Sequence, residues 1–119
     1  MATYKVTVTF AADPSPVVSI LPTHIPVAAE EINLITFTLN GPAGAEFTST
    51  PIQWLQGDPL VPVDVPPWFV MHRHDAQHFA LWDFNSVPET TDHHFQVYVF
   101  FNGQTYSHDP SIINEPPVG

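Results

Sequence analysis

Residues 95–107 read FQVYVFFNGQTYS, and this stretch decides the fold class. Apolar side chains occupy every second position of its first seven residues, which is the period of an extended strand. The apolar face consists of Phe95, Val97, Val99 and Phe101. Asn102-Gly103 follows, and both residue types readily take the positive φ angles of a two-residue type I′ turn. We therefore predict a β-hairpin in which Gln104–Ser107 is the returning strand.

The same alternation recurs along the chain, whereas helical periodicity does not. Residues 3–10 and 35–39 carry apolar side chains at every second position, which is typical of half-buried strands. Prolines recur from Pro14 to Pro67, and a proline inside a helix costs about 3 kcal/mol or more. Further short strands are predicted at residues 17–21, 46–49, 52–55, 68–72, 78–84 and 112–113.

Short strands separated by frequent turn signals are typical of an antiparallel sandwich. We predict an all-β, Ig-like β-sandwich of about seven to nine strands that forms one domain over residues 1–119, with a small barrel as the alternative. Residues 56–67 contain four prolines and are predicted to form an extended surface loop. Ile112-Ile113 is predicted to be a short last strand against the edge of the sheet.

The charge composition excludes several classes of partner. Two basic residues, Lys5 and Arg73, stand against twelve acidic ones, so the formal net charge is −10. Nucleic acids and anionic membranes attract clustered lysine and arginine, which this chain lacks. There is no cysteine, which excludes disulfides and thiol catalysis. No apolar run reaches the roughly 18 residues of a membrane helix, and residues 1–9 alternate unlike a signal peptide, so we expect a cytoplasmic protein.

A histidine-rich stretch, residues 72–78 with the sequence HRHDAQH, is the first candidate site. In an extended chain His72 and His74 project from one face. Asp75 or His78 would add a third donor after a turn, and the set suits zinc or another divalent transition metal. The alternative interpretation is a polar turn whose histidines point into solvent.

Two neighbouring features bear on this metal hypothesis. Arg73 places a positive charge between the two histidines, which disfavours a bound cation there. His93-His94 would supply a further donor if their strand lay beside the turn. No other cofactor is expected.

Aromatic residues are the second candidate. Trp54, Trp68 and Trp82 could form a platform for stacking a sugar or a peptide, although most large aromatic side chains of a small sandwich fill its core. Tyr98 and Phe100 lie on the face opposite to Phe101 in the alternating strand. They would form an exposed apolar strip, which predicts a subunit contact and a homo-oligomer, unless a loop covers it.

Catalytic patterns are missing from the sequence. Most carboxylates stand singly, beside prolines or in predicted turns, and those of Asp13-Pro14 and Asp58-Pro59 favour turns. There is no nucleophile elbow and no glycine-rich phosphate loop. We therefore expect no catalytic residues and a protein that is not an enzyme.

Residues 106–116 read YSHDPSIINEP. This stretch resembles the ending of the small bacterial proteins grouped as the DP-EP family. The resemblance is looser at Ile35–Asn40, which Gly-Pro follows, and in the strand before Asn102-Gly103. It implies a bacterial β-sandwich and assigns neither an activity nor a catalytic residue.

These observations lead to two functional hypotheses. The first is a non-enzymatic β-sandwich that self-associates or binds a protein or carbohydrate partner. The alternative is a metal- or carbohydrate-binding module centred on His72, His74, Asp75 and His78 together with nearby aromatic side chains.

Overall fold

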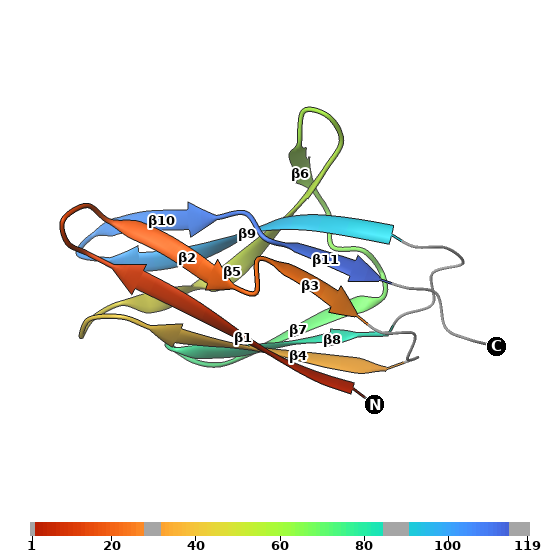
Figure 1. Ribbon diagram of the computed structural model, residues 1–119, viewed down its shortest axis with the longest axis horizontal. Helices are drawn as coiled ribbons and strands as arrows, with labels where there is room; N and C mark the ends of the chain where they lie inside the picture. Colours follow the sequence, from red (N-terminus) through yellow and green to blue (C-terminus); the bar gives the residue numbers. More distant parts are fainter. Residues whose placement is uncertain (1, 28–31, 85–90, 115–119) are drawn as a thin grey trace.

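The computed structural model describes residues 2–27, 32–84 and 91–114, and these form an all-β sandwich (Figure 1). No helix occurs in these ranges, and the strands form two separate sheets packed face to face, so the predicted fold class is confirmed and the barrel alternative is not adopted. The strands are β1 (Ala2–Ala11), β2 (Val17–Leu21), β3 (His24–Val27), β4 (Asn33–Asn40), β5 (Glu46–Gln56), β6 (Val61–Val63), β7 (Phe69–Asp75), β8 (His78–Asp83), β9 (Thr91–Phe101), β10 (Gln104–His108) and β11 (Ser111–Asn114).

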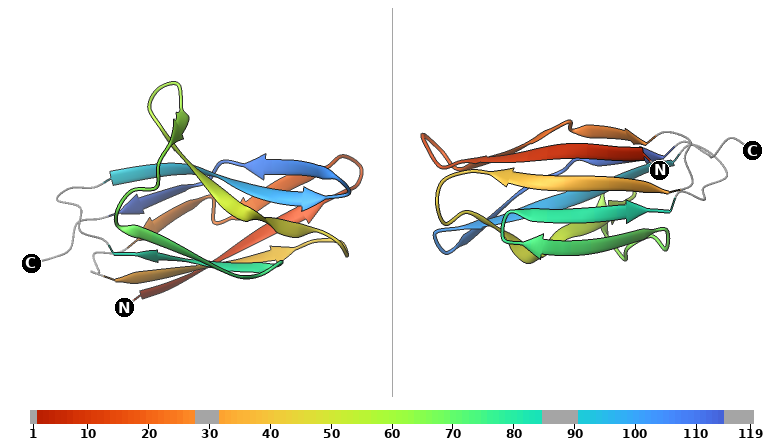
Figure 2. Two further views of the ribbon diagram at one scale, coloured as in Figure 1. Left: turned by 180° about the vertical axis from the view of Figure 1, so that it is seen from behind. Right: turned by 90° about the horizontal axis from the view of Figure 1, so that it is seen from below.

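Sheet A has five strands in the order β2-β1-β4-β8-β7, and sheet B has six in the order β3-β11-β9-β5-β6 with β10 also paired to β9 (Figure 2). Most pairs are antiparallel, as predicted, but β1 pairs with β4 in parallel and β11 pairs with β3 in parallel. A parallel pair needs a crossover connection. The chain supplies one between β1 and β4 by passing through β3, which belongs to the other sheet.

The predicted hairpin forms as the sequence indicates. Asn102 and Gly103 have φ angles of 51° and 80°, and Gln104 pairs directly with Phe101 across a two-residue turn. The inward residues Phe95, Val97 and Val99 are completely buried. The strands predicted at residues 3–10 and 35–39 likewise become β1 and β4, with their apolar side chains directed into the core.

Aromatic rings from both sheets meet at the centre of the core. Phe37 of β4 stacks on Phe79 of β8 with ring centroids 4.3 Å apart, and Phe47 of β5 meets Phe79 edge-on at 4.7 Å. All three side chains are buried. This cluster therefore holds the two sheets together in addition to the aliphatic side chains around it.

The described chain contains eleven strands, so the predicted number of seven to nine was too low. Residues 56–67 include the short strand β6, which tolerates Pro62 because it lies at the edge of sheet B, where one side of a strand needs no partner. The two segments predicted at 46–49 and 52–55 form the single strand β5, which has a shift of register between Phe47 and Ile52. Figure 1 shows the β5–β6 hairpin projecting beyond the sandwich.

The predicted position of the last strand was wrong. β11 does not lie at a sheet edge but between β9 and β3, and Ile112 is completely buried. The local sequence favours a short strand in either position, whereas the internal position depends on β3, which is distant in the chain. The final residues of the stretch 106–116 lie outside the described ranges.

Candidate ligand-binding pocket

The structure separates the four predicted metal-binding residues into two pairs. His78 Nδ1 donates to the carboxylate of Asp75 at 2.8 and 3.0 Å, and this hydrogen bond is the main cause that lowers the pKa of Asp75. The rings of His72 and His74 lie edge to face with centroids 4.7 Å apart. In the described ranges, no group of three or more histidine or carboxylate side chains is placed to hold one metal ion.

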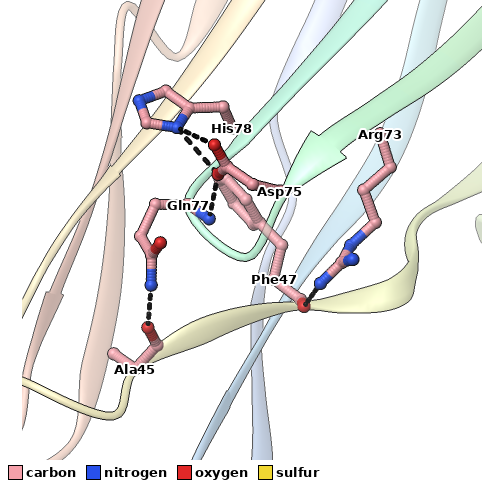
Figure 3. A network of polar contacts seen from close by, with 6 residues as sticks. All are labelled: Ala45, Phe47, Arg73, Asp75, Gln77 and His78. Carbon is pink, nitrogen blue, oxygen red and sulfur yellow. Dashed lines mark hydrogen bonds and ion pairs between the residues drawn. The ribbon is translucent and has the colours of Figure 1, made fainter.

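Arg73 takes no part in either pair. Its guanidinium donates to the carbonyl oxygen of Phe47 at 3.1 Å, which ties β7 to β5 of the opposite sheet (Figure 3). Gln77 reinforces this connection by donating from Nε2 to the carbonyl oxygen of Ala45 at 3.2 Å. Because side chains alternate along a strand, Arg73 lies on the face opposite to His72. The positive charge expected between the histidines is therefore directed elsewhere.

The three tryptophans do not form one platform. Trp54 is buried and stacks on Phe69 with ring centroids 4.4 Å apart. Trp82 follows the buried Leu81 in β8 and stacks on the exposed Phe84 at 6.5 Å, on the outer face of sheet A. Trp68 lies beside His93 with centroids 5.5 Å apart.

A pocket of about 630 Å³ lies along the β5–β6 hairpin, lined by residues from its base to its turn. Its aromatic wall is made by Trp54, Trp68 and His93, since the His93 ring is 5.5 Å from Trp68 and 6.4 Å from Trp54 between centroids. The remaining lining residues are Leu55, Gln56, Gly57, Leu60, Val63, Asp64, Val65, Pro66, Pro67, Asp92 and His94. His93 and His94 thus belong to this pocket with Trp54 and Trp68.

Two side chains of the pocket wall each carry a nitrogen atom that has no hydrogen-bond partner among the described residues. These atoms, Trp68 Nε1 and His93 Nε2, are both buried. Burial also lowers the pKa of His93, which favours the neutral form of its ring. Leaving a buried polar group unpaired costs about 1–3 kcal/mol, so each of these nitrogens gains free energy from a partner supplied from outside the chain.

The titratable side chains that line the pocket are aspartates and histidines. Asp64 is exposed, and Asp92 Oδ2 lies 3.4 Å from His94 Nε2. The described lining contains neither lysine nor arginine. The pocket therefore offers no counter-charge to an anionic ligand.

Tyr98 and Phe100 lie on the outer face of sheet B, as the alternation predicted. Phe100 is 38% exposed, whereas its neighbour Phe101 packs on Phe10 with ring centroids 5.2 Å apart. The hydroxyl of Tyr98 donates to Gln96 Oε1 at 2.6 Å, which holds the phenol ring along the strand. The apolar strip exists on the free chain, and the contact predicted for it stays a prediction.

Comparisons with known proteins add little to this description. No family model matches the chain, and no curated protein sequence matches it. Among solved structures, the N-terminal domain of phage TP901-1 ORF48 is similar at 13% identity and a TM-score of 0.34, with 99% of this chain and 98% of that chain covered. The resemblance to the DP-EP family therefore stays a prediction. None of the described residues forms a helix long and apolar enough to cross a membrane.

Proposed function

We propose that the protein is a non-enzymatic binding module whose ligand, a neutral saccharide, enters the pocket beside Trp68. The observation that carries this proposal is the pair of unpaired nitrogens, Trp68 Nε1 and His93 Nε2, in an aromatic pocket wall. Ligand pockets are typically apolar and aromatic with a few polar groups that orient the ligand. This pocket has that composition.

A sugar suits these groups better than other small ligands. A hydroxyl group both donates and accepts, so one hydroxyl can accept from Trp68 Nε1 and another can pair with His93 Nε2 in either tautomer. The apolar face of a pyranose packs on indole rings, and the carboxylates of Asp64 and Asp92 accept further hydroxyl donors. The absence of lysine and arginine from the described lining disfavours phosphorylated or acidic sugars.

The lining also favours binding over catalysis. No serine, threonine, tyrosine or lysine occurs among the described lining residues, so they offer no nucleophilic hydroxyl or amine. Asp92 lies against His94, and the His93 ring is packed against Trp68 and Phe69. These contacts hold the side chains of Asp92 and His93 in fixed positions, which suits the binding of a ligand.

The test is calorimetric titration with maltose, cellobiose, lactose and diacetylchitobiose, of the parent and of Trp68→Phe. We expect at least one disaccharide to bind the parent, and Trp68→Phe to weaken it roughly 3- to 10-fold, because the variant keeps an aromatic ring but loses one hydrogen-bond donor. Because both nitrogens are covered in the free chain, binding must also move Trp68 or His93, which tryptophan fluorescence will report.

Trp82→Phe is the matched control, because Trp82 lies on the outer face of sheet A, away from the pocket lining. Its affinity for the sugar should equal that of the parent. Failure of the parent to bind any of the four disaccharides would contradict the saccharide proposal. Equal weakening by both variants would show that the pocket is not where the sugar binds.

A second candidate function is self-association through the outer face of sheet B. It is supported by the exposure of Phe100. A large apolar side chain in contact with water is unfavourable in a monomer and is buried when a second copy covers it. In sedimentation velocity with EDTA present, we expect the parent to sediment as a dimer and Phe100→Ser as a monomer. Phe84→Ser, which changes an equally exposed ring on the other sheet, should leave the dimer intact. A monomeric parent would contradict this candidate.

A further inference from the structure

We propose that His72 and His74 form half of a zinc site, and that one Zn²⁺ ion joins two copies of the chain through this pair. The site is separate from the pocket, because neither histidine lines it. Both side chains belong to β7, which is an edge strand of sheet A, and both are exposed.

The spacing of the two rings fits one shared ion. Zinc binds imidazole nitrogen at about 2.0–2.1 Å with tetrahedral angles, which places the centroids of two coordinating rings about 5 Å apart. The observed separation between the centroids of His72 and His74 is 4.7 Å. Small rotations of exposed rings are sufficient to aim one nitrogen of each at a common point.

The backbone explains why the rings are so close. The pairing of β7 with β8 shifts register between Arg73 and Asp75, so His74 is an extra residue without its own partner on β8. The alternation of side chains along β7 puts His72 and His74 on one face, and their ring centroids lie 4.7 Å apart.

The neighbouring groups leave these two imidazoles available. Asp75 and His78 are paired with each other, and Asp75 Oδ1 also accepts from the backbone N–H of Gln77 at 2.8 Å. The guanidinium of Arg73 is held at the carbonyl of Phe47. Across the described ranges, neither His72 nor His74 makes a side-chain hydrogen bond or an ion pair.

A second copy is the occupant that completes the site. Zinc in proteins is almost always four-coordinate, and no third histidine or carboxylate of the described chain is placed to join this pair. The free edge of β7 lets a second copy bring its own pair of histidines to the same ion. The positive charge of the bound Zn²⁺ ion also offsets part of the electrostatic repulsion between two chains that each carry a formal charge of −10.

The test is sedimentation velocity of untagged protein at pH 7.5, with EDTA and then with increasing ZnCl₂. The Phe100→Ser background is used so that association through sheet B does not contribute. We expect the mass to double with addition of zinc, with a saturation point of one ion for two chains, and to return to that of a monomer with excess EDTA.

The variants His72→Ala and His74→Ala should each abolish the zinc-dependent doubling. His78→Ala is the matched control, since it removes a histidine of the same hairpin that is already paired with Asp75, and it should dimerise with zinc as the parent does. The proposal is overturned if zinc leaves the sedimentation unchanged, if saturation requires one or more ions per chain, or if the double variant His72→Ala/His74→Ala still dimerises with zinc. Circular dichroism of each variant shows whether the sandwich is intact.

Discussion

Replacing Phe79 with alanine is expected to lower the free energy of unfolding by about 3–5 kcal/mol. Phe79 is 1% exposed, stacks on Phe37 at 4.3 Å and receives the edge of Phe47 at 4.7 Å. The substitution therefore removes contacts within sheet A and contacts between the two sheets, and leaves a cavity that rigid neighbouring strands cannot fill. Urea unfolding followed by circular dichroism measures the loss.

Phe84→Ala is the control for this substitution. The same side chain is lost, but Phe84 is 43% exposed and stacks only on Trp82 among the described rings. We expect a loss below about 1 kcal/mol. Comparable losses for the two variants would mean that Phe79 is not at the centre of the core.

The second large effect is expected at the turn between β9 and β10. Gly103 has a φ angle of 80°, which a β-branched residue adopts only at a cost of about 1–3 kcal/mol. A Cβ at this position meets no atom within 4 Å, so the penalty of Gly103→Val comes from the backbone and not from a clash. We expect the midpoint of urea unfolding to fall accordingly.

Gly103→Asn separates backbone strain from the loss of glycine itself. Asparagine tolerates the left-handed region, as Asn102 does next to it at 51°. Its loss of stability should be less than half that of Gly103→Val. If the asparagine variant were as unstable as the valine variant, the conformation of the turn would not be the cause.

The features of the fold that could be predicted from the sequence are those that depend on residues close together in the chain. Alternation over a few residues identified β1, β4 and β9, and the Asn-Gly pair identified the turn after Phe101. By contrast, the internal position of β11 depends on its pairing with β3, which lies far away in the sequence, as well as with β9. The continuity of β5 through Pro51 depends on its pairing with β9 on both sides of the register shift.

The same distinction applies to the candidate sites. Trp54, Trp68 and His93 were each notable in the sequence, but the packing of β9 beside β5 brings Trp54 and His93 together, and the turn before β7 adds Trp68 to the same wall. Alternation along an extended chain predicted that His72 and His74 share a face, and their ring centroids lie 4.7 Å apart. The hydrogen bond between His78 and Asp75, which takes both residues away from that pair, depends on the conformation of the turn between β7 and β8 and could not be predicted from spacing.

The position of β11 has a consequence for the order in which the protein is made. Every strand of sheet A has been synthesised by the time Asp83 is added to the chain, whereas β9, β10 and β11 of sheet B are still to come. The nascent chain therefore holds five strands whose apolar face has an incomplete cover, which is the kind of surface that aggregates or recruits chaperones. In the described chain β3 hydrogen-bonds to no strand except β11, so this early segment can join its sheet only after β11 has been translated.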